Sequence, residues 1–277
     1  SLLTVRFAHC HVDELLCVPE RNGKPRTGLG ACFFFDDVLE THRYYIPIAA
    51  LKEQKVITGY EDKTFHPDEP ITRAEAVALV LRATEGMRAN VNNGTGGSGG
   101  ETAVSIPDST SLTPPAIPYT DVPADAWFVN NVRRATELSI VSGYPDKTFR
   151  PLQEVSATEA AKITLSAYGF PVRTVQQGEQ WWEPFFEFAE SKNLLDPAAE
   201  TNELAPAHPL TRGEFAALLY RTATVKNENG APYDITREWL TFTHDINYYE
   251  LKYPRDWKVF RGTNHVAMWL SDSEKDQ

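Results

Sequence analysis

One short pattern, Thr or Ser followed three positions later by Glu and then by an apolar helical stripe, occurs three times in this 277-residue chain. The copies lie at residues 72–75, 156–159 and 211–214. Copies one and two align without a gap, with Glu75 and Glu159 84 positions apart, whereas Glu159 and Glu214 are 55 apart. An internal repeat constrains the architecture before any single residue does. The repeating unit is therefore about 55 residues long, with an insertion between the first two copies.

The insertion differs in composition from the rest of the chain. Residues 92–100 read Asn-Asn-Gly-Thr-Gly-Gly-Ser-Gly-Gly, and residues 113–115 read Thr-Pro-Pro. Such a segment cannot bury an apolar core and predicts a flexible linker, with a typical reach of roughly 30 Å. Copy one is thus expected to pack beside copy two, either within the same chain or by a domain swap with a neighbouring chain.

Each copy predicts a helix, a turn-rich loop and a second helix. In copy one the first helix is expected at 44–56, and Gly59 follows at a position that favours the left-handed conformation. The second helix is expected to start after Thr72, whose side chain forms a capping box with Glu75. Phe65 and its counterpart Phe149 are expected to anchor the loops in the core. A unit of this size cannot bury its own apolar faces, so three copies must pack together.

The motifs of the repeat resemble one known family. Copy one reads Phe-Asp-Asp-Val at 35–38, Ile-Thr-Gly-Tyr-Glu-Asp-Lys-Thr-Phe-His-Pro at 57–67 and Ile-Thr-Arg-Ala-Glu at 71–75. Copy two reads Tyr-Thr-Asp-Val at 119–122 and Val-Ser-Gly-Tyr-Pro-Asp-Lys-Thr-Phe-Arg-Pro at 141–151. Copy three keeps Leu-Thr-Arg-Gly-Glu at 210–214 but lacks the Gly-Tyr loop. Together they resemble the S-layer homology family.

The resemblance implies a mainly α fold, with three helix-loop-helix repeats in a pseudo-threefold arrangement and a short β-rich C-terminal extension. The expected parts are an N-terminal segment of uncertain fold (1–31), repeat one (32–86), a Gly/Ser/Pro linker (87–117), repeat two (118–172), repeat three (173–224) and a β-rich segment (225–277).

For function, the resemblance implies a non-enzymatic module without a cofactor, located at the extracellular cell wall or cell surface. Such modules bind a cell-wall glycopolymer, in many members a pyruvylated one, in grooves between the repeats. The polysaccharide-binding residues expected here are Arg73, Arg212, Gly59, Tyr60, Asp62, Gly143, Tyr144, Asp146, Lys147 and Trp127.

Physical chemistry supports the two arginines in that set. Each stands at the first position of a helix, where unpaired backbone N–H groups attract anions, and its planar guanidinium fits a carboxylate. Copy two has Ala157 instead, so the three grooves are not expected to be equivalent. Tyr60, Tyr144 and Trp127 are suited either to stacking on a sugar face or to packing against a neighbouring repeat.

The two ends of the chain carry weaker signals. Cys10, Cys17 and Cys32 lack the spacing of a zinc knuckle, so no metal site is expected; a disulfide with one free thiol and three reduced cysteines remain alternatives. Residues 249–253 alternate as a strand does, and Tyr-x-Leu-x-Tyr-Pro-x-x-Trp at 249–257 weakly resembles the start of a PsbP-like domain, partial here, or an appended hairpin.

Charge and composition narrow the remaining functions. A formal net charge of −11 argues against nucleic-acid binding. No segment has the run of about 20 apolar residues that spans a membrane. Adjacent acidic pairs such as Asp36-Asp37 do not provide the two facing carboxylates of a glycosidase. The alternative to a wall anchor is a helical scaffold that binds a protein partner in the cell envelope.

Overall fold

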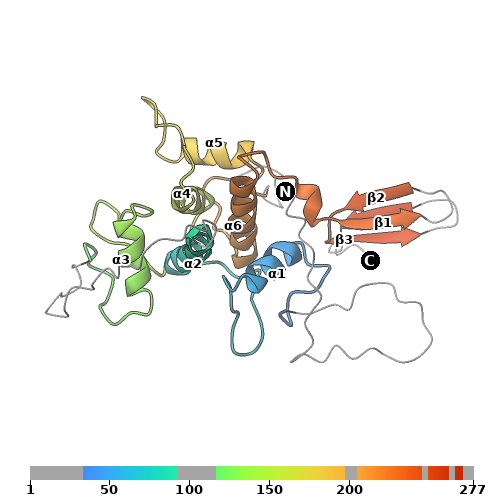
Figure 1. Ribbon diagram of the computed structural model, residues 1–277, viewed down its shortest axis with the longest axis horizontal. Helices are drawn as coiled ribbons and strands as arrows, with labels where there is room; N and C mark the ends of the chain where they lie inside the picture. The colour runs from blue at the N-terminus through green and yellow to red at the C-terminus, as the bar shows by residue number, and fades with distance from the viewer. Residues whose placement is uncertain (1–33, 93–116, 197–204, 245–248, 262–265, 271–277) are drawn as a thin grey trace, which may run out of the picture.

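The computed structural model describes residues 34–92, 117–196, 205–244, 249–261 and 266–270. Two α-helices from each repeat lie in these ranges: α1 (Tyr45–Glu53), α2 (Arg73–Asn92), α3 (Val129–Glu137), α4 (Ala157–Ala167), α5 (Glu183–Ser191) and α6 (Arg212–Asn227). The second helices, α2, α4 and α6, gather at the centre, and the first helices lie outside them (Figure 1). The expected mainly α fold with three helix-loop-helix units is confirmed.

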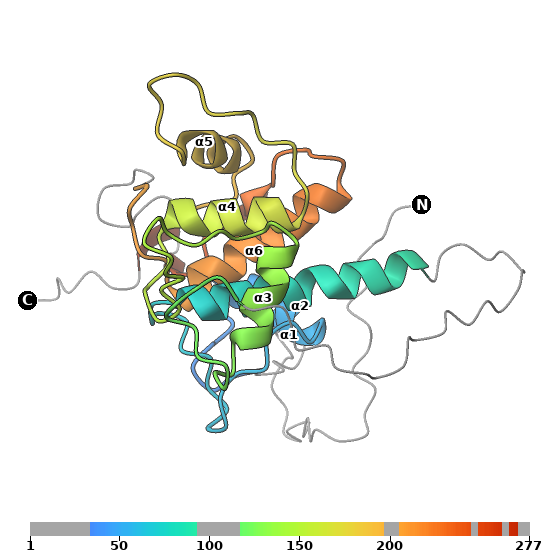
Figure 2. The ribbon, with the colours of Figure 1, turned by 90° about the vertical axis from the view of Figure 1, so that its left-hand side faces the viewer.

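The repeats interlock in a cycle. The second helix of each repeat packs against the first helix of the next one: α2 on α3, α4 on α5, and α6 back on α1. The view turned by 90° shows α4, α6 and α2 stacked between α5 and α1 (Figure 2). Since each of these helix pairs joins two repeats, no repeat buries its apolar residues alone, and one core runs through all three.

A closed ring of backbone hydrogen bonds joins the repeats where their second helices begin. The Ile71 N–H donates to the Leu210 carbonyl, the Leu210 N–H donates to the Val155 carbonyl, and the Val155 N–H donates to the Ile71 carbonyl, each at 3.0 Å. All three side chains are buried, at 0–4% exposure. The pseudo-threefold axis is therefore a backbone feature that each repeat contributes to in the same way.

Capping boxes start the second helices as expected. The Ser156 hydroxyl accepts from the Glu159 N–H, and the Glu159 carboxylate accepts from the Ser156 N–H. The same exchange links Thr72 with Glu75, and Thr211 with Glu214. These reciprocal bonds satisfy donors that a helix start otherwise leaves free.

The loop before each of the first two capping boxes is held by one carboxylate and one buried phenylalanine. Asp37 accepts from the Phe65 and His66 N–H groups at 2.8 and 2.6 Å. Asp121 accepts from the Phe149 and Arg150 N–H groups at 2.7 Å each. Phe65 and Phe149 are fully buried, which confirms their expected role as anchors.

The C-terminal part forms antiparallel hairpins after the 3-10 helix η1 (Ile235–Glu238). Strand β1 (Leu240–His244) pairs with β2 (Tyr249–Tyr253), with Leu240 opposite Tyr253. Strand β3 (Trp257–Arg261) pairs with β4 (Val266–Leu270), with Trp257 opposite Leu270. The strand expected at 249–253 is confirmed, and these strands extend to one side of the helices (Figure 1).

Two expectations concern residues that lie partly or wholly outside the described ranges. Helix α2 continues to Asn92, beyond position 87 where the linker was expected to begin, and 93–116 lie outside the described ranges. Cys10, Cys17 and Cys32 also lie outside them. In the described part of the chain, none of the helices is long and apolar enough to cross a membrane.

The buried loop anchors generate a first prediction. Phe149→Ala removes a fully buried ring and is expected to lower the free energy of unfolding by about 3–5 kcal/mol. Leu152→Ala, three residues away on the same loop, is the control because Leu152 is 75% exposed and a surface change costs about 0.5 kcal/mol or less. Urea unfolding measures both, and equal losses would show that Phe149 does not anchor the loop.

Candidate functional site

The backbone N–H groups at the helix starts are already bonded, so the expectation that they attract an anion is wrong. In repeat one the Arg73 N–H donates to the Gln153 carbonyl at 2.9 Å, and the Ala74 N–H to that of Pro151 at 3.0 Å. In repeat three the Arg212 N–H donates to the Glu69 carbonyl at 2.8 Å. Each helix start thus binds the loop of the following repeat, and anion recognition at these positions must come from side chains.

Arg73 lies in a groove formed mainly by repeat two. Its side chain is 8% exposed, with Nη1 3.5 Å from the Glu159 carboxylate and Nη2 donating to the Ser142 carbonyl at 3.1 Å. The guanidinium lies 5.3 and 5.0 Å from the ring centres of Tyr144 and Phe149. The buried Nε–H has no hydrogen-bond partner among the residues that the structure describes.

The same groove holds a second cation and an exposed indole. Lys162 on α4 and Trp181 before α5 line a cavity of about 190 Å³ together with Arg73, Gly143 and Tyr144. The Lys162 Nζ lies 5.0 Å from the centre of the Trp181 ring. Burial, and then the nearby Arg73 charge, lower the pKa of Lys162. We call this cavity, defined by Arg73, Ser142, Lys162 and Trp181, the first groove.

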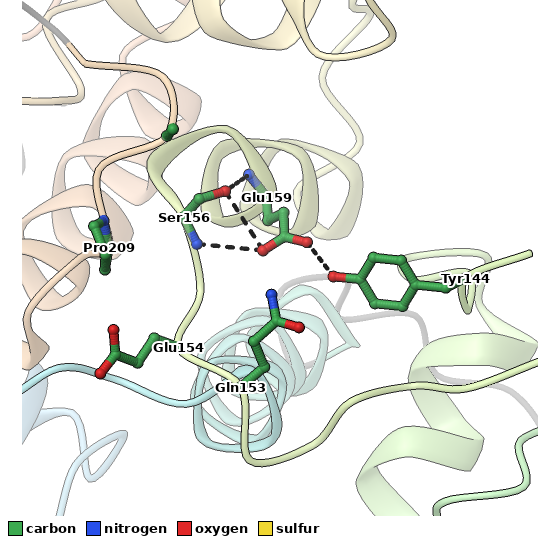
Figure 3. Close-up of a pocket in the computed structure, with 7 residues that line it drawn as sticks. Tyr144, Gln153, Glu154, Ser156, Glu159 and Pro209 are labelled. Atoms are coloured by element: carbon green, nitrogen blue, oxygen red, sulfur yellow. Dashed lines mark hydrogen bonds between the residues drawn. The ribbon is translucent and has the colours of Figure 1, made fainter. Parts of the chain in front are cut away.

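Glu159 connects the first groove to a larger open pocket on its other side. Its carboxylate caps α4 through Ser156 and also accepts the Tyr144 hydroxyl, and both side chains point into that pocket (Figure 3). The pocket has a volume of about 450 Å³ and is also lined by Gln153, Glu154 and Pro209. Its charged side chains are carboxylates, which disfavour an acidic ligand there.

Arg212 lies between repeats three and one as Arg73 lies between repeats one and two, but its guanidinium bonds through other nitrogen atoms. Its Nε donates to the Phe65 carbonyl at 2.9 Å, and Nη1 lies 3.0 Å from the Glu75 carboxylate. Its guanidinium lies 5.0 Å from the ring centre of Tyr60. The position equivalent to Lys162 is Ala78, since both are the sixth residue of their helices. At the positions equivalent to Arg73 and Lys162, this second groove therefore has one cation, Arg212, which pairs with Glu75.

The loop residues of the expected site shape the loops through their backbones. Gly59 has φ of +73°, as expected for the left-handed position. A Cβ at Gly59 would meet the Phe35 ring, and one at Gly143 would meet the Tyr119 ring. Lys147 takes φ of +61° at a tight turn, and its carbonyl accepts the Thr120 N–H at 2.9 Å.

The two loop aspartates form turns with threonines two positions later. Asp62 accepts from the Thr64 N–H at 3.0 Å, and Asp146 accepts from the Thr148 N–H at 3.0 Å. The Thr148 bonds and the nearby Arg150 lower the pKa of Asp146 to about 2. These carboxylates are therefore engaged in holding the loops, although both remain exposed at the surface.

Trp127, expected in the site, is 61% exposed and packs edge-on against Phe128. It stands two residues before α3, as Trp181 stands two residues before α5. The expected set omitted Lys162 and Trp181. The signal for Lys162 in the sequence was its charge, because the other residues at 160–165 of α4 have small or apolar side chains. Among the described residues no group of three or more His, Cys, Asp or Glu side chains is placed to hold a metal.

The Tyr144 hydroxyl generates a second prediction. Burial, and then its bond to Glu159, raise the pKa of Tyr144 from 10.0 to about 12. The pKa of Tyr144 is higher in the folded chain than in the unfolded chain. The hydroxyl therefore contributes its full stabilisation below pH 10, and this stabilisation is lost as pH rises through about 12. The difference in phenolate absorbance between the wild type and Tyr144→Phe should titrate near pH 12. A midpoint near pH 10 would contradict the bond between Tyr144 and Glu159.

Comparison with known proteins agrees with this architecture. The family model described as the S-layer homology domain matches residues 34–77 and 118–161, which cover the loop and the start of the second helix in repeats one and two. Both matched stretches include the buried phenylalanine and the capping box described above.

Curated relatives carry surface-related names. The middle cell wall protein of Brevibacillus brevis is 24% identical over 83% of this chain and 18% of its own length. The surface layer protein of Brevibacillus choshinensis is 24% identical over 63% of this chain and 13% of its own length. An endoglucanase of Bacillus sp. (strain KSM-635) is 22% identical over 84% of this chain and 22% of its own length.

The chain thus spans less than a quarter of the length of each of these relatives. The matched family and the relatives' names indicate an extracellular location at the cell wall or cell surface. Two matched repeats in register, interlocked helices and shared capping boxes lead to one conclusion: the chain carries S-layer homology repeats, at residues 34–77 and 118–161.

Proposed function

We propose that this chain holds a surface protein on the cell wall by binding an acidic wall polysaccharide, a pyruvylated one in particular, in the first groove. Anchoring of surface proteins to the wall is the role that the family match supports. The observation that carries the finer proposal is the meeting of Arg73, Lys162 and Trp181 in one small cavity.

The charges of the first groove favour a carboxylate ligand. Arg73 faces the Glu159 carboxylate at 3.5 Å, so this pair is nearly neutral as a unit. Lys162 adds a positive charge that is partly desolvated, which is why its pKa is lowered. A bound carboxylate would offset that cost by placing an opposite charge beside the ammonium group.

An exposed indole suits the sugar ring that carries the acid. Trp181 is 46% exposed, so part of its face is open at the groove. The ring combines an apolar face with a polar edge, as does a hexose. A pyruvate ketal joins a carboxylate to a sugar ring within a few bonds, and the first groove presents cations and an indole side by side.

Local charge explains how an acidic protein can bind an acidic polymer. The formal net charge is −11, yet charges further apart than a Debye length of about 8 Å are largely screened at physiological salt. Arg73 and Lys162 line the same cavity, so recognition depends on these near charges.

The third prediction tests Lys162. Lys162→Gln removes the charge while keeping much of the side-chain length, and should weaken binding to purified cell-wall sacculi about tenfold, or about 1.4 kcal/mol. Arg134→Gln is the matched control, because its side chain is 49% exposed and pairs with Glu137 on α3, outside the groove. Co-sedimentation before and after mild acid removal of pyruvate ketals measures both variants.

The acid treatment separates the alternatives. Wild-type binding that is lost on treatment, with Lys162→Gln weakened and Arg134→Gln unchanged, is the expected result. Binding that survives treatment would move recognition away from the carboxylate. Absence of binding to sacculi would leave a scaffold for a protein partner as the better account.

The fourth prediction compares the two arginines of the pattern. Arg73→Gln should reduce sedimentation with sacculi about tenfold or more, whereas Arg212→Gln should change it little, because the second groove has Ala78 in place of the lysine. Each change leaves a glutamate without its partner, so loss of stability alone would affect both variants similarly. Equal loss of binding by two variants that keep the wild-type unfolding midpoint in urea would place polymer recognition in both grooves.

A further inference from the structure

The positions of repeat three that are equivalent to the first groove carry residues of a different kind, and we call this place the third groove. Counting from the helix ends gives the equivalent positions. Ala157 replaces Arg73, Ala217 replaces Lys162, Asp196 replaces Ser142 and Arg43 replaces Trp181. The third groove thus lacks counterparts of Arg73, Lys162 and Trp181, and it carries Arg43 and the Asp196 carboxylate where the first groove has Trp181 and Ser142.

That carboxylate is part of a buried ionic cluster. Arg221 on α6 is 2% exposed, and its Nη1 and Nη2 donate to the two Asp196 carboxylate oxygens at 2.9 and 3.3 Å. Its Nε and Nη2 donate to the two oxygens of Glu238 at 2.7 Å each. Glu238 is 4% exposed and belongs to η1, after the third repeat.

A second arginine ties the turn before β3 to the same place. The Arg255 Nε donates to the Glu238 carbonyl at 2.7 Å, and Nη1 donates to the Glu40 carbonyl of repeat one at 2.6 Å. The guanidinium lies 5.3 Å from the ring centre of Tyr45 on α1. The C-terminal residues therefore contact repeats one and three together.

Little space remains once these residues are in place. The cavity that Arg43, Asp196 and Arg221 line together with Trp239, Pro254 and Arg255 has a volume of about 50 Å³, against about 190 Å³ in the first groove. Residues 235–239 and 254–256, which we call the docked segment, close the groove from outside. Around it Arg43, Arg221 and Arg255 are matched by Asp196, Glu238 and Asp256.

We infer that the third groove is a socket for the chain's own docked segment and not a polymer site, with the Arg221–Glu238 pair as its latch. The pair joins the last helix of the repeats to the first element after them. The C-terminal hairpins are thereby fixed to the repeat bundle. The statement that the third groove is not a polymer site rests on the function proposed above, whereas the docking of the segment does not.

Glu238→Gln tests the latch in the full chain. The change removes one of the two carboxylates that pair with the buried Arg221, and it is the carboxylate that joins η1 to α6. Amide hydrogen exchange in residues 235–239 and at Trp257 should therefore accelerate by on the order of tenfold or more, while the ring amides of Ile71, Val155 and Leu210 keep their protection. Arg255→Ala, which removes the second tie, should produce the same pattern to a smaller extent.

Glu228→Gln is the matched control. Glu228 pairs with Arg237 of η1 at 2.6 Å, but both side chains are at least 40% exposed. Exchange in the docked segment should stay at the wild-type rate in this variant. Equal exchange in Glu238→Gln, Arg255→Ala and the wild type would overturn the latch, because the segment would then not depend on the buried pair.

Polymer binding supplies a separate test of the socket. The number of sites for solubilised wall polysaccharide per chain should be the same in the wild type and in Glu238→Gln, since release of the docked segment leaves Arg43 and Arg221 beside the Asp196 carboxylate and supplies no counterpart of Trp181. An additional site in the variant would overturn the socket and show that the segment covers a polymer groove. If neither protein binds polysaccharide, the exchange result still decides the docking, and the failure belongs to the proposed function.

Discussion

Three backbone hydrogen bonds among Ile71, Val155 and Leu210 form the ring on which the rest of the molecule depends. Each bond joins two different repeats, and all three lie under buried side chains, where an unmade bond costs about 1–3 kcal/mol. The ring fixes where each second helix begins, because the residue after each ring member is the helix cap. From there each second helix packs on the first helix of the next repeat. Removal of any one repeat would leave two open ends in the ring.

The ring also determines where anions can and cannot bind. It brings each helix start onto the loop of the next repeat, so the first helical N–H groups meet the carbonyls of Gln153, His208 and Glu69. The helix ends, which elsewhere attract anions, here hold the repeats together. Recognition of an acidic ligand therefore falls to side chains that project beyond the ring. In the first groove these are Arg73 and Lys162, which come from different repeats and meet only after the repeats interlock.

Backbone bonds hold the repeats together and side chains form the grooves, and this difference explains which features the sequence predicts and which it does not. The repeat, the capping boxes, Gly59 and the buried Phe65 and Phe149 depend on residues close together in the chain, and the structure confirms them. The first groove depends on cyclic packing, which places Trp181, from the start of repeat three, beside the loop of repeat two. An alignment of one repeat with another cannot reveal that pairing. The role expected for the helix N–H groups was wrong for the same reason, since their partners lie about 80 residues away in the case of Arg73 and Gln153.

A fold held by backbone bonds at its axis places few demands on the side chains in its grooves. Each helix start donates to the next loop whether its first residue is Arg73, Ala157 or Arg212. The grooves can therefore differ chemically while the repeats stay in register. The first groove combines two cations with an indole, and the second keeps one paired arginine. In the third, Arg221 donates both to Asp196 of repeat three and to Glu238, which lies outside the repeats. Three equivalent positions on one backbone frame thus support three different chemistries, and the loss of a ligand site in one groove leaves room for a structural joint in the same place.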